Sequence, residues 1–152
     1  MKAAKRSYPL HISKSESINL PYSEVGIREY VKEKMRKYQG ERFKNKYLKV
    51  YIYINRHSVR EIYQKCANNR KAAELALYLP YILRNAKPTE LHLPIHSNLQ
   101  EIMGFKYITK MICNIKNVGI AKVVIGFTED GKAILYSITN YQRLNKTNQF
   151  DF

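Results

Sequence analysis

The chain has 152 residues, of which 45% are apolar and 26% are charged. This composition is that of one globular domain that can bury a core without a disulfide or a structural metal, which argues against a disordered chain. Its 27 lysines and arginines outnumber its 12 acids, and a net charge of +15 exceeds the value of about 2–8 that solubility requires. We therefore expect a polyanionic partner, with RNA as the first choice.

The sequence also lacks the marks of several other classes. No stretch approaches the roughly 18 apolar residues of a membrane helix, and the first residues lack the apolar segment of a secretory signal. We expect a cytoplasmic protein without membrane contact. Cys66 and Cys113 lie in apolar patterns without metal-ligand spacing, so we expect reduced core thiols, no metal and no cofactor.

The predicted elements begin with a basic amphipathic helix. Ser23 is a plausible N-cap, apolar residues follow at helical spacing, and Gly40 can end the helix. Residues 48–54 are rich in β-branched and aromatic side chains and predict a strand. A second helix follows, where Ser58 and Glu61 have the spacing of a capping box.

The rest of the chain predicts one more helical segment and then a sheet. Strong helix formers begin near Arg70, and Pro80 either kinks this helix or opens a new turn. Pro94 cannot donate to a ladder, so its strand is expected at an edge, and the turn 129–131 indicates a hairpin. The expected strands are residues 90–96, 105–114, 120–127 and 132–139.

Together these elements predict an α+β fold. We expect N-terminal helices packed on one face of a C-terminal antiparallel meander of about four strands, with residues 48–54 added at an edge. The opposite face of the sheet would stay open. We divide the chain into an arm over residues 1–20, one basic domain over 21–141 and a polar tail over 142–152.

The choice of chemistry follows from the residue types present. Acids are few and scattered, and the sequence lacks the motifs of phosphate-loop enzymes, dinucleotide-binding proteins, serine hydrolases and zinc proteases. Histidine, lysine, arginine and hydroxyl groups suit metal-independent RNA cleavage, in which the 2′-hydroxyl attacks the adjacent phosphate. That reaction needs a base, an acid and cations that stabilise the developing charge.

His57 is the first candidate base. It lies at a predicted helix N-terminus, where free amides favour an anion, and Arg56 and Arg60 could clamp a phosphate. An exposed histidine and a solvated arginine pair are the alternative interpretation. His92 and His96 could form a metal pair but lack a third ligand, whereas His96 alone could be a catalytic or phosphate contact.

Further candidates lie on the predicted strands. Lys106 and Lys110 share a face at a period of two, although surface lysines are common on half-exposed strands. The last strand ends in hydroxyls and rings, with Ser137, Thr139 and Tyr141 among them. Tyrosine rings can stack on unpaired bases, so this group resembles part of an RNA-binding surface.

The order of elements resembles a known superfamily. The strand LKVYIYI, the helices SVREIYQKC and KAAELALYLPYILRNA, and the meander KYITKMICNI, IAKVVIGF and KAILYSIT are similar to the barnase–EndoU–colicin–RelE-like ribonucleases. Within it they look most like modules of the polyvalent proteins of phages and conjugative elements. The resemblance implies a toxin-like, metal-independent endoribonuclease countered by an antitoxin or immunity protein. The matching positions would be His57 or Lys71, Lys106, Lys110, Ser137, Thr139 and Tyr141.

Two other functions are compatible with the same residues. The chain could be a non-catalytic nucleic-acid-binding module of a mobile element, or an adaptor that docks an acidic protein. Basic charge and tyrosines favour cleavage and binding equally. Only a histidine, an arginine and a hydroxyl that converge in space would favour cleavage.

Overall fold

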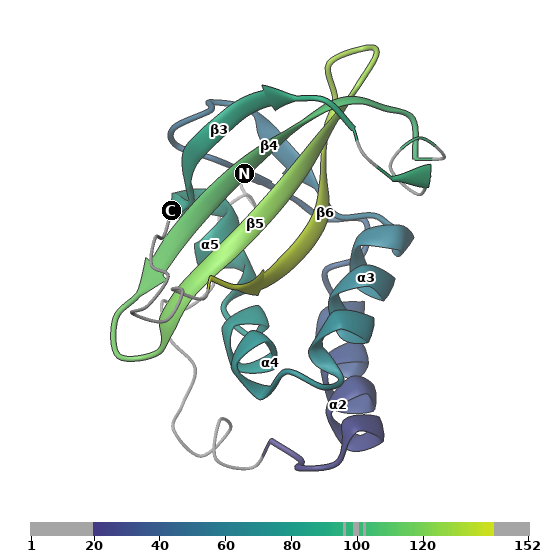
Figure 1. The fold of residues 1–152 in the computed structure, drawn as a ribbon, viewed down its shortest axis with the longest axis vertical. Coiled ribbons are helices and arrows are strands. Elements are labelled where there is room, and N and C mark those ends of the chain that lie inside the picture. The colour runs from purple at the N-terminus through teal and green to yellow at the C-terminus, as the bar shows by residue number, and fades with distance from the viewer. Residues whose placement is uncertain (1–19, 96, 99–100, 102, 142–152) are drawn as a thin grey trace, which may run out of the picture.

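The computed structural model describes residues 20–141 except 96, 99, 100 and 102. It has an α+β fold in which a sheet packs against helices (Figure 1). The helices are α2 (Glu24–Arg36), α3 (Arg56–Cys66), α4 (Arg70–Ala76) and α5 (Leu79–Asn85). The strands are β1 (Arg42–Lys44), β2 (Tyr51–Tyr53), β3 (Lys87–Leu93), β4 (Phe105–Ile115), β5 (Gly119–Thr128) and β6 (Ala133–Asn140).

The sheet has six strands in the order β1-β2-β6-β5-β4-β3. The meander of β4, β5 and β6 is antiparallel and β3 is an edge strand, which confirms those predictions. The prediction of about four antiparallel strands was wrong, because β2 pairs in parallel with β6 and β1 occupies the other edge. A parallel pair joins segments that are distant in sequence, so no local pattern indicates it.

The main core lies between the sheet and the helices. Val124 and Ile125 of β5 pair with Ser137 and Leu135 of β6, which leaves Tyr136 as an extra residue in β6. Because of this extra residue, Leu135 and Ile138 both contribute to the core. The opposite face of the sheet was predicted to be open. It instead carries a second apolar cluster made of Phe105, Ile108, Val124, Ile134 and Tyr136.

The helix termini follow local capping. Ser23 Oγ accepts a hydrogen bond from the Gly26 amide at 2.9 Å, which confirms the predicted N-cap of α2. The capping box predicted at Ser58 and Glu61 was wrong, because α3 begins one residue after Asn55 and Asn55 is its N-cap. The Asn55 side chain accepts a hydrogen bond from the Ser58 amide at 2.9 Å, which makes Ser58 the third residue of the helix. Ser58 is fully buried there, and its hydroxyl donates to the Leu135 carbonyl of β6.

Two further contacts position the helical layer. Pro80 lies in the first turn of α5, and this confirms that the proline separates two helices. The buried Asn45 holds the β1–β2 loop, because its amide donates to the carbonyls of Leu83 and Ala86 and its carbonyl accepts from Tyr47 and Leu48. Leu20, assigned to the arm, is also buried.

Candidate anion-binding groove

A groove runs between α2 and α3. The two helices lie side by side beyond β6, as Figure 1 shows, and each buries one apolar stripe. Their outward sides border a hollow of about 220 Å³. Its lining residues are Lys32, Arg36, Gln39, Arg56, Val59, Arg60 and Tyr63. We call this hollow the α2–α3 groove.

The α2–α3 groove is cationic, and no acid lines it among the residues that the structure describes. Lys32 Nζ lies 5.5 Å from the ring centre of Tyr63, and Arg36 pairs at 3.7 Å with Glu33, an exposed residue that does not line the groove. Within the part of the chain that the structure describes, Arg56 and Arg60 form no ion pair or hydrogen bond through their side chains. Their charges repel those of Lys32 and Arg36 on the facing wall, and a bound anion would relieve that repulsion.

Three other predicted phosphate contacts have internal partners. Lys106 Nζ lies 3.2 Å from a carboxylate oxygen of Glu129, and Lys110 Nζ lies 3.8 Å from one of Glu90. These are mostly exposed pairs of modest strength, but each brings a negative charge beside the lysine. A β-bulge between residues 105 and 107 also interrupts the period of two that was predicted to align the two lysines.

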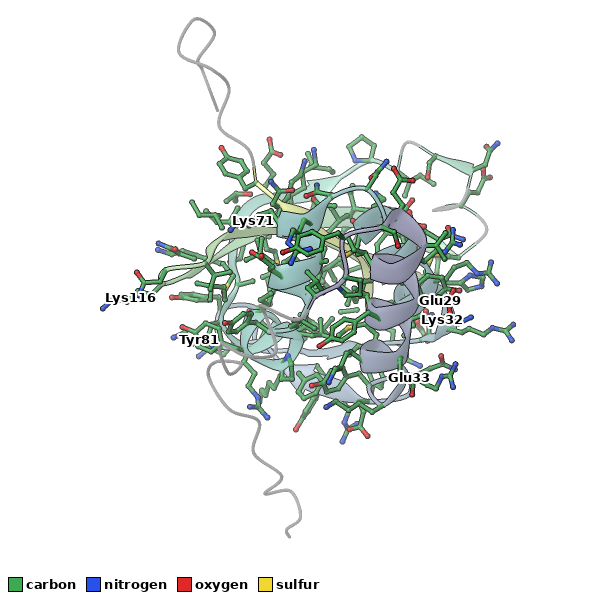
Figure 2. All side chains as sticks on the ribbon, turned by 90° about the horizontal axis from the view of Figure 1, so that it is seen from below. Glu29, Lys32, Glu33, Lys71, Tyr81 and Lys116 are labelled. Carbon is green, nitrogen blue, oxygen red and sulfur yellow. The ribbon has the colours of Figure 1, made fainter. Side chains whose placement is uncertain are left out.

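Lys71 links α4 to the turn between β4 and β5. Its ammonium donates to the Val118 carbonyl at 2.8 Å and lies 3.2 Å from Glu74. Figure 2 shows Lys71 on the opposite side of the helical layer from Lys32. Lys71 therefore does not contribute to the α2–α3 groove.

The predicted catalytic residues do not come together. His57 is half-buried and follows Arg56 on α3, but it does not line the groove, since adjacent helical residues point about 100° apart. Tyr141 borders a separate hollow on the outer face of the sheet together with Lys110. His96 lies outside the described residues, so the structure does not place it.

The hydroxyls of the last strand are also separate from the groove. Ser137 is 3% exposed and lies opposite Val124, and Thr139 is half-buried opposite Lys122. The hollow that Tyr141 and Lys110 line, of about 380 Å³, includes Glu90 in its lining. A carboxylate in the lining makes this hollow a weaker anion site than the α2–α3 groove.

One wall of the groove was predicted from the sequence, and the other was not. Arg56 and Arg60 were predicted as a phosphate clamp, and the structure places both on the α3 wall. Lys32 and Arg36 form the α2 wall, and they were not among the predicted site residues. Their spacing of four residues was the available signal, because it puts both on one helix face. The sequence does not show that this face lies beside α3.

Comparison of the chain with family models, curated proteins and solved structures gave no match. Among residues 20–141, the placed side chains include no group of three His, Cys, Asp or Glu residues that could hold a metal ion. None of the described helices combines the length and the hydropathy needed to cross a membrane.

Proposed function

We propose that the chain binds RNA, and that the α2–α3 groove holds phosphates of the RNA backbone. The observation that carries this proposal is the pair Arg56 and Arg60, which line a groove without an acid and have no partner among the described residues. Arginine presents several donors in a planar fork that matches a phosphate group.

The arrangement suits a repeated anion better than a single one. Arg56 and Arg60 are one helical turn apart, as are Lys32 and Arg36, so each wall offers two cations separated by about 6 Å along its axis. A nucleic-acid backbone supplies phosphates in series. An acidic protein would need an apolar contact as well, and Val59 is the only aliphatic residue of the described lining.

Binding is better supported than cleavage. A general base must lie within hydrogen-bond reach of the proton that it removes. Among the residues that the structure describes, no histidine, serine or threonine lines the groove, and Tyr63 supplies the one hydroxyl. A metal-independent endoribonuclease that uses His57, His96 or Tyr141 stays a prediction, as does an antitoxin or immunity partner.

A salt titration tests the proposal. We would measure fluorescence anisotropy of a short labelled RNA and of a DNA of the same sequence at several salt concentrations. Four phosphate contacts to a single strand predict a slope of about −2.8 in log K against log salt, or about a 50-fold loss of affinity from 50 to 200 mM. Absence of binding, or an affinity that does not depend on salt, would refute the proposal that the groove holds RNA phosphates.

The same samples distinguish RNA binding from RNA cleavage and from the binding of an acidic protein. Incubation of the complex with EDTA, followed by a denaturing gel, reports RNA cleavage. Chelator-resistant cleavage that disappears in His57→Ala would replace a binding module with a ribonuclease. Salt-sensitive binding to poly-glutamate without binding to RNA would select the acidic-protein adaptor instead.

A further inference from the structure

The outward face of the β1–β2 hairpin carries two tyrosines. Side chains alternate along β2, so that Ile52 is fully buried in the core while Tyr51 and Tyr53 project from the other face. Tyr51 keeps 43% of its surface exposed. These rings lie on the sheet, apart from the α2–α3 groove, and the proposed phosphate contacts do not use them.

Cations surround both rings. The Arg42 guanidinium lies 4.3 Å from the ring centre of Tyr51 and donates a hydrogen bond of 3.2 Å to the Tyr53 hydroxyl. Lys132 Nζ lies 4.6 Å from the ring centre of Tyr53, and Lys44 Nζ lies 5.9 Å from that of Tyr51. No carboxylate of the described residues forms an ion pair with these three cations. We call the five residues the tyrosine platform.

We propose that the tyrosine platform binds unpaired nucleobases by stacking, so that the chain selects single-stranded RNA over a duplex. This inference rests on the proposed function, because it assumes that the ligand is a nucleic acid. Aromatic rings flanked by lysine and arginine suit such a ligand, since the rings stack on bases and the cations attract the adjoining phosphates. Tyr51 is exposed and Tyr53 is half-buried. Tyr51 and Tyr53 are two residues apart, about 7 Å along the strand, and offer places for two bases.

The position of Arg42 over Tyr51 is compatible with this role. An exposed cation–π contact changes an equilibrium constant by about 2- to 5-fold. Stacking of one base on an aromatic side chain changes it by about 5- to 150-fold. A base can therefore displace the guanidinium from the ring, and the released Arg42 remains close enough to contact a phosphate.

The platform and the groove adjoin each other along the chain. Arg56 follows Tyr53 by three residues, so their Cα atoms are at most about 11 Å apart. The Gly40 amide donates to the Ile54 carbonyl at 2.7 Å, and the Ile54 amide donates to Glu41 at 3.0 Å. These bonds fix the end of β2 to the segment that follows α2. One RNA strand can place bases on the platform and phosphates in the groove.

A tryptophan probe tests stacking directly. The chain contains no tryptophan, so Tyr51→Trp introduces a single indole fluorophore at the platform. A single-stranded RNA should quench its emission, because the base contacts the ring. An abasic sugar–phosphate oligomer of equal length, and a blunt duplex, should quench it far less. Equal quenching by the RNA and the abasic oligomer would overturn the proposal.

A matched pair of alanine variants tests the affinity. Tyr51→Ala should weaken binding of single-stranded RNA by about 5-fold or more. Tyr22→Ala is the control, since Tyr22 is also exposed and also carries an arginine over its ring, Arg70 at 4.4 Å. Tyr51→Phe should keep nearly full affinity, which shows that the ring and not the fold of the hairpin is responsible.

The outcomes separate the platform from the groove. If the wild type binds the abasic oligomer as tightly as RNA and Tyr51→Ala has no effect, the platform is refuted and the groove stands. Equal losses in Tyr51→Ala and Tyr22→Ala also refute it. If neither RNA nor the abasic oligomer binds, the proposed function fails together with this inference.

Discussion

The α2–α3 groove and the outer face of the sheet carry the same residue types in different electrostatic surroundings. On the sheet, cross-strand pairing places Glu90 opposite Lys110, so the lysine receives a carboxylate neighbour from the register itself. In the groove, Arg56 and Arg60 have no acid in the facing wall. The comparison teaches that a high net charge alone does not distinguish the two surfaces, whereas local compensation by acids does.

Charge reversal at matched positions should break this comparison most clearly. Arg56→Glu/Arg60→Glu and Lys106→Glu/Lys110→Glu change the net charge equally, so any general attraction falls by the same amount in both. We expect the groove variant to lose RNA affinity by at least about 100-fold, because it puts carboxylates against phosphates. Fluorescence anisotropy with one labelled RNA measures both variants.

The sheet variant serves as the control for that experiment. Its lysines already have carboxylate partners, and we expect a loss of less than about 10-fold from the change in net charge. Equal losses in the two variants would mean that affinity depends on total charge and would remove the reason to assign a site to the groove. A larger loss in the sheet variant would move the site to the outer face.

The second prediction distinguishes the packing of α3, which should affect stability, from the charges of α3, which should affect RNA affinity. Ser58 Oγ donates to the Leu135 carbonyl and accepts from the Asn55 amide, so Ser58→Ala leaves two groups without a bond. We expect a loss of about 2 kcal/mol in the free energy of unfolding, measured by urea denaturation. RNA affinity of the folded variant should stay within about twofold, because no groove cation is removed.

Ser137→Ala is the matched control for the stability measurement. Ser137 is as inaccessible as a core residue, but its hydroxyl has no hydrogen bond to any described group. We expect its loss to change the free energy of unfolding by less than about 0.5 kcal/mol. Similar losses in the two serine variants would show that the contact between α3 and β6 is not what fixes the helix.

The part of the fold that local signals determine could be predicted from the sequence. Ser23 begins α2 as a side-chain cap, and alternation with turn residues defines the meander. β1 could not be predicted, because three residues are too few for a periodic pattern. The cap of α3 was placed at Ser58 because a serine followed by a glutamate at the third position fits the motif. The structure gives the role to Asn55, whose side-chain oxygen accepts from the Ser58 amide at 2.9 Å.

The candidate site was predictable only where one element supplies it. Arg56 and Arg60 lie on one helix, so their common face follows from helical spacing. The α2 wall required knowledge of which helices pack together, which depends on tertiary contacts. Residues 48–54 alternate aliphatic residues with Lys49, Tyr51 and Tyr53, and this pattern contained the signal for the platform.

The smallest predicted effect concerns the pH dependence of stability that buried thiols cause. Burial raises the pKa of Cys66, at the end of α3, to about 12, and burial raises that of Cys113, in β4, to about 11, where Lys46 partly opposes the rise. A raised pKa means that the folded state keeps a proton which the unfolded chain loses above its ordinary thiol pKa of 9.0. The free energy of unfolding should therefore fall as pH rises past that value.

Cys66→Ala isolates this contribution, because the variant lacks the thiol but keeps every other group that titrates. For Cys66, the loss between pH 8 and pH 9.5 amounts to about 0.8 kcal/mol. Urea denaturation at the two pH values should give a loss smaller by this amount in Cys66→Ala than in the wild type. An identical loss in both proteins would mean that the Cys66 thiol ionises in the folded state as readily as in the unfolded chain. In that case water reaches the end of α3, and the helix that supports the α3 wall of the groove is not tightly packed against the core there.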